Sequence, residues 1–287
     1  MLGFLPFANL LKVSYQKIFS AIILIGCLST SLNAQNDTDQ DDGRYQKELS
    51  KTPSFSIYGD NYFVTGTRIN ESPNSQNSDA KYQLGFKQII SRDLLPFDTH
   101  LFFTYQQISF WDIYQDSFPF RDTNYNPSIG LGRLLFDKAG EINGGLWFAF
   151  EHQSNGRDEE DSRSWNYFSL LYYKAFSDKF HSSLEAWAPI GTKDGNQDLL
   201  EYIGYGELTA TWRPTDILFI EGKFRKALRA DWRGSAQISV NLRYSKRTNQ
   251  FLYLQYFVGQ GESMLDYRMN SNFLRIGIVF KDLLFWD

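Results

Sequence analysis

Short segments in which apolar and polar residues alternate recur along the chain from about Phe55 onward. In Gln237-Ile238-Ser239-Val240-Asn241-Leu242 every second residue is apolar. Successive side chains of a β-strand point to opposite faces, so this alternation predicts strands with one apolar and one polar face. We expect about twelve such strands, centred on residues 62–66, 82–86, 101–105, 129–134, 146–150, 165–170, 182–187, 204–209, 219–223, 236–242, 252–256 and 274–279.

The composition leaves two classes of all-β fold, a transmembrane barrel and a soluble β-protein. Aromatic residues make up 17% of the 287 residues, and no apolar run approaches the roughly 20 residues of a transmembrane helix. Aromatic-rich alternating strands with polar loops are typical of a transmembrane β-barrel, but also of a soluble β-sandwich or lipocalin-like barrel. Strand alternation cannot decide which face is the exterior. The acidic excess, 33 Asp+Glu against 29 Lys+Arg, argues against a nucleic-acid partner.

The amino terminus favours the membrane class. Lys12 and Lys17 flank the start of an apolar run, Ile18 to Leu28, and small and polar residues follow as far as Ala34. A cationic segment, a short apolar core and a small final residue predict a secretory signal peptide cleaved after Ala34. The alternative is a lipoprotein signal in which Cys27, the one cysteine of the chain, is lipidated.

We therefore predict three segments. Residues 1–34 form the signal peptide, and residues 35–53 form a flexible arm, because this acidic stretch lacks apolar periodicity. Residues 54–287 form one transmembrane β-barrel, since no linker divides them. Closure of the barrel removes the unpaired strand edges that lipid could not satisfy.

One predicted hairpin carries residues suited to catalysis. Its first strand runs from Ile142 to Ser154, and the second begins near Ser164. Residues two apart in a strand share a face, so His152 and Ser154 lie side by side, and Asn166 returns beside them. Large apolar residues at 146, 148, 150, 168 and 170 share this face. On a barrel with an apolar exterior, the three polar side chains would point toward lipid.

These residue types suit acyl transfer. A serine hydroxyl is a weak nucleophile until a histidine accepts its proton, and the histidine needs a third group to fix its tautomer. The amide oxygen of Asn166 can accept the second ring N–H of His152 without carrying charge. An ionised aspartate would be costly at a lipid-facing position, so asparagine fits the predicted location.

Four segments together resemble the outer-membrane phospholipase A family of Gram-negative bacteria. They are His152-Gln153-Ser154-Asn155-Gly156-Arg157, Ser162-Arg163-Ser164-Trp165-Asn166, residues 117–127 and residues 259–267. The resemblance extends from about Tyr58 to Phe285. It implies a twelve-stranded antiparallel transmembrane β-barrel in the outer membrane, with its site near the outer leaflet. It also implies a calcium-dependent phospholipase A, active as a homodimer, that hydrolyses the sn-1 and sn-2 acyl esters of phospholipids and lysophospholipids.

The resemblance also implies roles for individual residues. Ser154 would be the nucleophile, His152 the general base and Asn166 the residue that orients it. The backbone N–H of Gly156 would meet the oxyanion. Calcium would be held by the main-chain oxygen of Arg157, by the hydroxyl of Ser162 and by Ser117 of a second subunit, and Ca²⁺ prefers such oxygen ligands.

The loop between the two strands contains four consecutive acids. We expect Asp158 and Glu160 to be solvated charges, whereas Glu159 and Asp161 remain candidates for auxiliary calcium ligands. Gln107 matches a position that lies at the subunit interface in this family, but could instead face the barrel lumen.

Two other motif segments receive no catalytic role. We expect Arg121, Asp122 and Asn124 to pack a loop. We expect Glu262 and Asp266 to pair with nearby loop charges, Arg268 among them.

Two competing hypotheses are a catalytically silent outer-membrane barrel of porin-like or structural type and a soluble secreted esterase.

Overall fold

A computed structural model describes residues 38–191, 195–245 and 247–282 of the chain. The chain divides into two compact units, residues 1–45 and residues 46–287, and every strand belongs to the second unit. The strands are β1 (Phe55–Ile57), β2 (Asn61–Arg68), β3 (Ser78–Leu95), β4 (Thr99–Trp111), β5 (Phe120–Phe136), β6 (Ile142–Ser154), β7 (Ser164–Ser177), β8 (Phe180–Ile190), β9 (Gly206–Thr215), β10 (Leu218–Lys226), β11 (Gly234–Arg243), β12 (Gln250–Gly259) and β13 (Ser271–Phe280).

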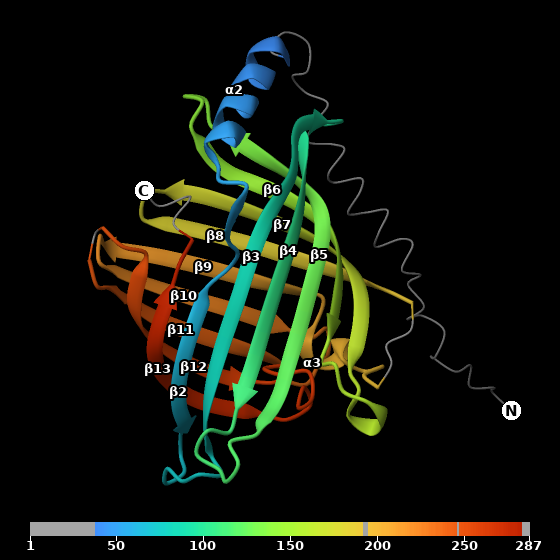
Figure 1. The fold of residues 1–287 in the computed structure, drawn as a ribbon, viewed down its shortest axis with the longest axis vertical. Coiled ribbons are helices and arrows are strands. Elements are labelled where there is room, and N and C mark those ends of the chain that lie inside the picture. The colour runs from blue at the N-terminus through green and yellow to red at the C-terminus, as the bar shows by residue number, and fades with distance from the viewer. Residues whose placement is uncertain (1–37, 192–194, 246, 283–287) are drawn as a thin grey trace, which may run out of the picture. The chain divides into compact units, whose positions relative to one another are not determined.

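The strands close into one antiparallel barrel (Figure 1). Each strand from β4 to β13 pairs with its neighbours in sequence, β13 pairs with β2, and β3 pairs with both β2 and β4. The short β1 pairs with residues 86–88 of β3, and β2 pairs with residues 78–83 of the same strand edge. Since β1 and β2 share one position in the wall, the described residues form a twelve-stranded barrel, which confirms the predicted fold.

Burial shows which face of each strand is the exterior. Along β12, Leu252 and Leu254 are 51% and 39% exposed, whereas the alternate residues Tyr253 and Gln255 are buried. Buried Arg275 on β13 follows the same rule. Apolar side chains cover the outside and polar side chains fill the inside, as expected for a barrel that faces lipid. The structure therefore excludes the soluble barrel with an apolar interior.

The two ends of the barrel differ in their connections. Residues 96–98, 178–179 and 216–217 are short turns at one end, whereas residues 155–163, 195–205 and 260–270 belong to long loops at the other. In bacterial outer-membrane barrels the long loops are extracellular. The β6–β7 hairpin, which carries the predicted catalytic residues, turns at this long-loop end.

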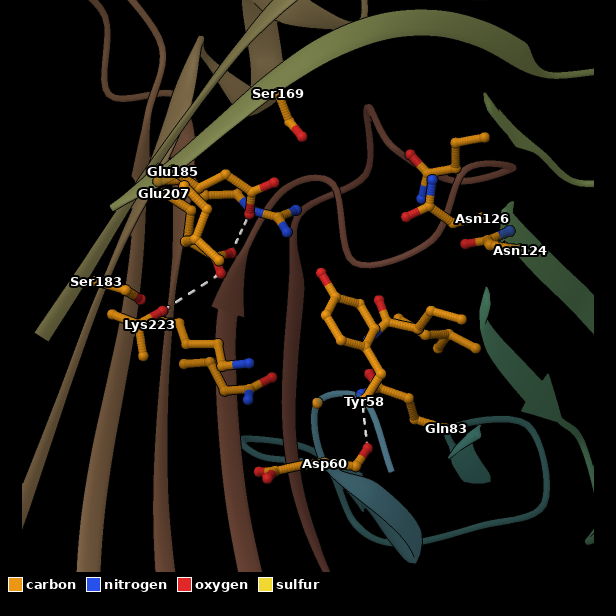
Figure 2. Close-up of a pocket in the computed structure, with 18 of the residues that line it drawn as sticks. Tyr58, Asp60, Gln83, Asn124, Asn126, Ser169, Ser183, Glu185, Glu207 and Lys223 are labelled. Carbon is orange, nitrogen blue, oxygen red and sulfur yellow. Dashed lines mark hydrogen bonds and ion pairs between the residues drawn. The ribbon is translucent and has the colours of Figure 1, made fainter. Parts of the chain in front are cut away.

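The lumen is polar in its middle and apolar toward each end. A cavity of about 490 Å³ runs through it, lined by ionisable side chains that include Glu185, Glu207 and Lys223 (Figure 2). One apolar cluster contains Tyr62, Val64, Phe219, Phe251, Tyr253 and Val279. The other contains Trp165, Tyr167, Trp187, Leu199, Leu200, Ile203, Met264 and Tyr267, and includes residues from two long loops.

Helix α2 (Thr38–Lys51) corrects one expectation. Residues 35–53 were predicted to form a flexible arm, but residues 38–51 of this segment are helical. The Arg92 guanidinium donates to the main-chain oxygens of Leu49 and Thr52, which satisfies carbonyls at the carboxyl end of the helix. This partner comes from β3, so the local sequence pattern could not reveal it.

A second helix, α3 (Leu200–Ile203), lies in the β8–β9 loop. Neither described helix is both long and apolar enough to cross a membrane. The predicted signal peptide, residues 1–34 with Cys27, lies outside the described residues.

Candidate active site

Strands β6 and β7 present the three predicted catalytic residues on one face. The bounds of β6 and the start of β7 agree with the prediction. Phe148, Phe150 and Leu170 are 45%, 41% and 37% exposed, and strand alternation puts His152, Ser154 and Asn166 on the same outer face. Glu151 and Tyr167, which point the other way, are buried. The candidate site therefore lies on the outer wall of the barrel.

His152 and Asn166 form a direct cross-strand pair. The Nδ1 atom of His152 lies 2.8 Å from the Oδ1 atom of Asn166. An amide oxygen only accepts hydrogen bonds, so the Nδ1 of His152 donates and the neutral ring keeps its lone pair on Nε2. In this tautomer Nε2 is available as a base.

Ser154 lies two residues beyond His152 on the same face. Two residues of extended strand separate their Cα atoms by about 6.6 Å, which brings the hydroxyl within reach of the imidazole ring. In the described part of the chain, the Ser154 hydroxyl has no hydrogen-bond partner. Catalytic hydrogen bonds are often long or absent without substrate, so the missing Ser154–His152 hydrogen bond is compatible with a catalytic serine.

Asn155 holds the loop that follows Ser154, and sequence reasoning assigned it no role. Its backbone N–H donates to the main-chain oxygen of Arg163 at 3.0 Å, and its Oδ1 accepts from the Arg163 N–H at 2.9 Å. Its Nδ2 donates to the main-chain oxygen of Asp161 at 2.9 Å. One buried side chain thus joins both ends of the loop. Asparagine often hydrogen-bonds nearby main chain in turns, and this was the available signal.

Gly156 occupies a position that favours glycine. Its φ of +64° lies in the left-handed region, and a Cβ there would lie 3.1 Å from Cε2 of Tyr125. Its N–H donates to no group among the described residues. A free backbone donor therefore stands two residues after Ser154.

The three predicted calcium ligands are only partly brought together. Ser162 ends the 3-10 turn η2 (Glu159–Asp161), and its N–H donates to the main-chain oxygen of Glu159 at 3.2 Å. Arg157 lies in the same loop, and its guanidinium donates to the main-chain oxygen of Arg121. Ser117 lies on the exposed β4–β5 loop, and no hydrogen bond joins it to the other two ligands in the described part of the chain.

The donor set fits a hard cation. Arg157 and Ser162 supply main-chain and hydroxyl oxygens, and the four acids between them are exposed. Asp161 pairs with the Arg157 guanidinium at 3.5 Å. Among the described residues no group of three or more His, Cys, Asp or Glu could hold a metal. An ion here would therefore depend on neutral oxygens, with further ligands from outside the loop.

Gln107 lies on the outer face of β4. It accepts from the Tyr105 hydroxyl at 2.9 Å and donates to the Ser109 hydroxyl at 3.1 Å. Its neighbours Gln106 and Ile108 line the lumen cavity instead. This arrangement rules out the lumen-facing alternative, and a role for Gln107 at an interface stays a prediction.

Two other motif segments meet inside the barrel mouth. The Asn124 Oδ1 accepts from the Met264 N–H at 3.0 Å, and the Asp122 Oδ2 accepts from the Leu265 N–H at 3.0 Å. Both residues thus hold the β12–β13 loop, as predicted for a packing role. Asp266 pairs with Arg121 at 3.7 Å.

The expected pairing of Glu262 with Arg268 is wrong. Buried Glu262 accepts from Lys81 at 3.1 Å and from Arg275 at 2.6 Å, whereas Arg268 pairs with Asp198. The partners come from β3 and β13, which adjacent loop sequence could not reveal. Burial alone would raise the pKa of Glu262, but Arg275 and Lys81 lower it to about 2.

The fold and the exterior surface define an outer-membrane β-barrel. Residues 44–280 match the family model described as Phospholipase A1. The Phospholipase A1 of Salmonella typhimurium is 30% identical over 221 residues, which cover 75% of this chain and 73% of that protein.

Two solved structures have the same fold. The outer membrane phospholipase A from Escherichia coli matches with a TM-score of 0.72 and 25% identity, over 80% of this chain and 100% of that one. The Salmonella typhi outer membrane phospholipase, solved as a dimer with bound calcium, matches with a TM-score of 0.72 and 25% identity, over 85% and 99% of the two chains. The chain belongs to the phospholipase A1 family.

Proposed function

We propose that this protein is a calcium-dependent phospholipase A that hydrolyses the sn-1 and sn-2 acyl esters of phospholipids and lysophospholipids. The observation that carries the proposal is the His152–Asn166 hydrogen bond of 2.8 Å on the lipid-facing wall, with Ser154 two residues away on the same face. Acyl chains in the bilayer would reach this wall directly, so the substrate need not enter the lumen.

In the proposed reaction, the Nε2 atom of His152 accepts the proton of Ser154 as the hydroxyl oxygen attacks the ester carbonyl carbon. The imidazolium then returns that proton to the leaving alcohol oxygen, which releases the lysolipid and leaves an acyl-serine. Water attacks the acyl-serine with the same base, and the fatty acid leaves. Asn166 keeps the proton of His152 on Nδ1 throughout both halves of the cycle.

The choice of asparagine follows from the location of the site. A carboxylate beside His152 would stabilise the imidazolium more strongly, but its ionisation would be costly on an apolar exterior. The neutral Asn166 amide orients the ring without that cost. The free N–H of Gly156 is our candidate donor to the oxyanion that forms on the ester carbonyl oxygen.

Calcium would be held by the main-chain oxygen of Arg157 and the hydroxyl of Ser162. The Salmonella typhi relative was solved as a dimer with bound calcium, which supports a calcium site in this chain. Bound calcium would supply positive charge near the developing oxyanion. Ser117 lies apart from the other two ligands, so we propose that it serves a second copy of the chain, and that the protein is a homodimer when active.

The test compares purified wild type with Ser154→Ala in mixed phospholipid micelles, with and without calcium. We expect wild type to release fatty acid only with calcium, and Ser154→Ala to release almost none. Undiminished hydrolysis under thorough chelation would exclude the calcium requirement. Absence of hydrolysis by wild type at any calcium concentration would favour a catalytically silent barrel.

A further inference from the structure

A proline interrupts the main-chain ladder opposite the proposed general base. Strands β5 and β6 pair Tyr125 with Ser154 and Ser128 with Glu151. The register is the same on both sides of the interval, which puts Pro127 opposite His152. Proline has no N–H, so Pro127 cannot donate to the carbonyl oxygen of His152.

The neighbouring side chain supplies the missing donor. The Nδ2 atom of Asn126 donates to the carbonyl oxygen of His152 at 3.0 Å, and the same atom donates to the hydroxyl oxygen of Tyr167 at 3.2 Å. Both hydrogens of the amide nitrogen are used. The orientation of the amide is determined, because a carbonyl oxygen can only accept. Asn126 lines the lumen cavity (Figure 2), so it contacts the His152 main chain from the lumen side of the wall.

A buried carboxylate anchors this contact. The Tyr167 hydroxyl donates to Glu151 at 3.0 Å, and the Ser169 hydroxyl donates to the same carboxylate. The Tyr167 hydroxyl hydrogen is used in the bond to Glu151, so the Tyr167 oxygen is left to accept from Asn126. Hydrogen-bond donation therefore starts at Asn126 and runs two ways, through Tyr167 to Glu151 and directly to the His152 carbonyl oxygen.

The next inward pair supports the same register. The Trp165 Nε1 donates to the Gln153 Oε1 at 2.8 Å, and the Trp165 ring stacks on the Tyr167 ring with centroids 3.9 Å apart. The outward His152–Asn166 pair thus stands between two inward pairs, each with its own hydrogen bond. Lateral movement of β6 against β7 would break all three pairs together.

We propose that Asn126 and Tyr167 are positioning residues for the His152–Asn166 pair. They hold the main chain of His152 from the lumen side, in place of the ladder hydrogen bond that Pro127 lacks. This inference rests on the proposed function, because it assumes that His152 is the base. It assigns a task in the reaction to side chains that cannot touch a lipid substrate.

The first experiment compares Asn126→Leu and Tyr167→Phe with wild type. Asn126→Leu removes both donors, and we expect kcat to fall about tenfold or more, since small displacements of a catalytic group are costly, while KM stays unchanged. Tyr167→Phe keeps the Asn126–His152 contact and should cost less. The matched controls are Ser128→Ala and Tyr173→Phe, which remove inward hydroxyls of the same two strands that bond to Thr104 and His181 instead of to Asn126 or His152. Both controls should keep the wild-type kcat.

The second experiment restores the main-chain donor. The double variant Asn126→Leu with Pro127→Ala regains an N–H opposite His152, and we expect kcat to return to within about threefold of wild type. A purely structural role for Asn126 predicts no such rescue. Assembly is followed by heat-modifiable migration on a gel. If Asn126→Leu assembles poorly, recovery of assembly and kcat in the double variant supports the proposal, and continued failure contradicts it.

Ser154→Ala, run in parallel, separates this inference from the proposed function. If Ser154→Ala stays active, the proposed function is wrong. If Ser154→Ala is inactive while Asn126→Leu has the wild-type kcat, only the positioning role is wrong. The rate at which a sulfonyl fluoride labels Ser154 gives a second readout, and it should fall in Asn126→Leu in proportion to kcat.

Discussion

The two faces of the β6–β7 hairpin satisfy their polar groups in different ways. On the outer face, the His152–Asn166 pair has one hydrogen bond and stands among exposed aromatic rings such as Phe148 and Phe150. On the lumen face, Glu151 accepts from both the Tyr167 and Ser169 hydroxyls. Alternate residues of the same strands thus separate a sparse outer site from a dense inner network.

The difference shows where charge is tolerated in this barrel. The lumen contains ion pairs such as Arg225–Glu207, at 2.7 Å, whereas the outer site pairs an imidazole with an amide. Buried charges need partners, and a wall that faces lipid offers few of them. We infer that the outer face is specialised for chemistry, and that the lumen face supplies the rigidity this chemistry requires.

The largest expected effect comes from removing Ser154, the proposed nucleophile on the outer face. Ser154→Ala should lower the rate of phospholipid hydrolysis by about 10³-fold or more, since the remaining groups cannot form an acyl intermediate. The barrel should assemble normally, as judged by heat-modifiable migration. The control is Ser164→Ala, which removes the hydroxyl directly across the strand pair. If Ser164→Ala abolished hydrolysis and Ser154→Ala did not, Ser164 would be the nucleophile.

The next largest effect is expected on the free energy of unfolding, when a charge in the lumen is removed. Glu262→Gln leaves Lys81 without its carboxylate partner and leaves Arg275 with Asp79 alone, and should lower the free energy of unfolding by about 3 kcal/mol. Urea denaturation of the purified barrel measures it. The control is Asp266→Asn in the same loop, where a more exposed pair at 3.7 Å should contribute less than about 1 kcal/mol. Equal losses of unfolding free energy in the two variants would contradict this distinction between buried and exposed ion pairs.

Glu262 also predicts a dependence of stability on pH. Its folded pKa of about 2 lies below its ordinary value of 4.5, so its contribution is fully present above about pH 4.5. That contribution is lost as the pH falls from 4.5 toward 2. The difference in unfolding free energy between wild type and Glu262→Gln should therefore shrink over this range. A difference that stays constant with pH would show that Glu262 does not titrate in this way.

A smaller effect is expected from the partner of His152. Asn166→Ala should lower kcat about ten- to hundredfold with KM unchanged, because the ring loses its orientation while the nucleophile and base remain. Steady-state kinetics on mixed micelles measure it. A loss as large as that of Ser154→Ala would indicate that Asn166 does more than orient the ring. Full activity would remove it from the site.

The smallest effects are expected from the exposed loop acids. Asp158→Asn and Glu160→Gln should change activity less than about twofold at saturating calcium, and stability by less than about 0.5 kcal/mol, since both side chains are solvated. Glu159→Gln and Asp161→Asn test the auxiliary role, and a raised calcium requirement would support it. A raised calcium requirement in Asp158→Asn would show that the auxiliary role was assigned to the wrong carboxylates.

Much of the fold followed from local patterns. Strand alternation predicted β6 from Ile142 to Ser154 and the start of β7 at Ser164, and both agree with the structure. The helical segment Thr38–Lys51 was missed because its stabilising partner, Arg92, is distant in sequence. The partners of Glu262 were missed for the same reason.

The sequence by itself determined that His152 and Ser154 share a face, because a strand of period two leaves no other choice, and the alternation of apolar residues predicted the same face for Asn166. Only the tertiary structure decided that this face is the exterior, since closure of the barrel turns one side of every strand outward. It also revealed Asn126 behind His152, a contact between residues 26 apart in the chain. Such contacts depend on strand register, and register is set by the whole barrel.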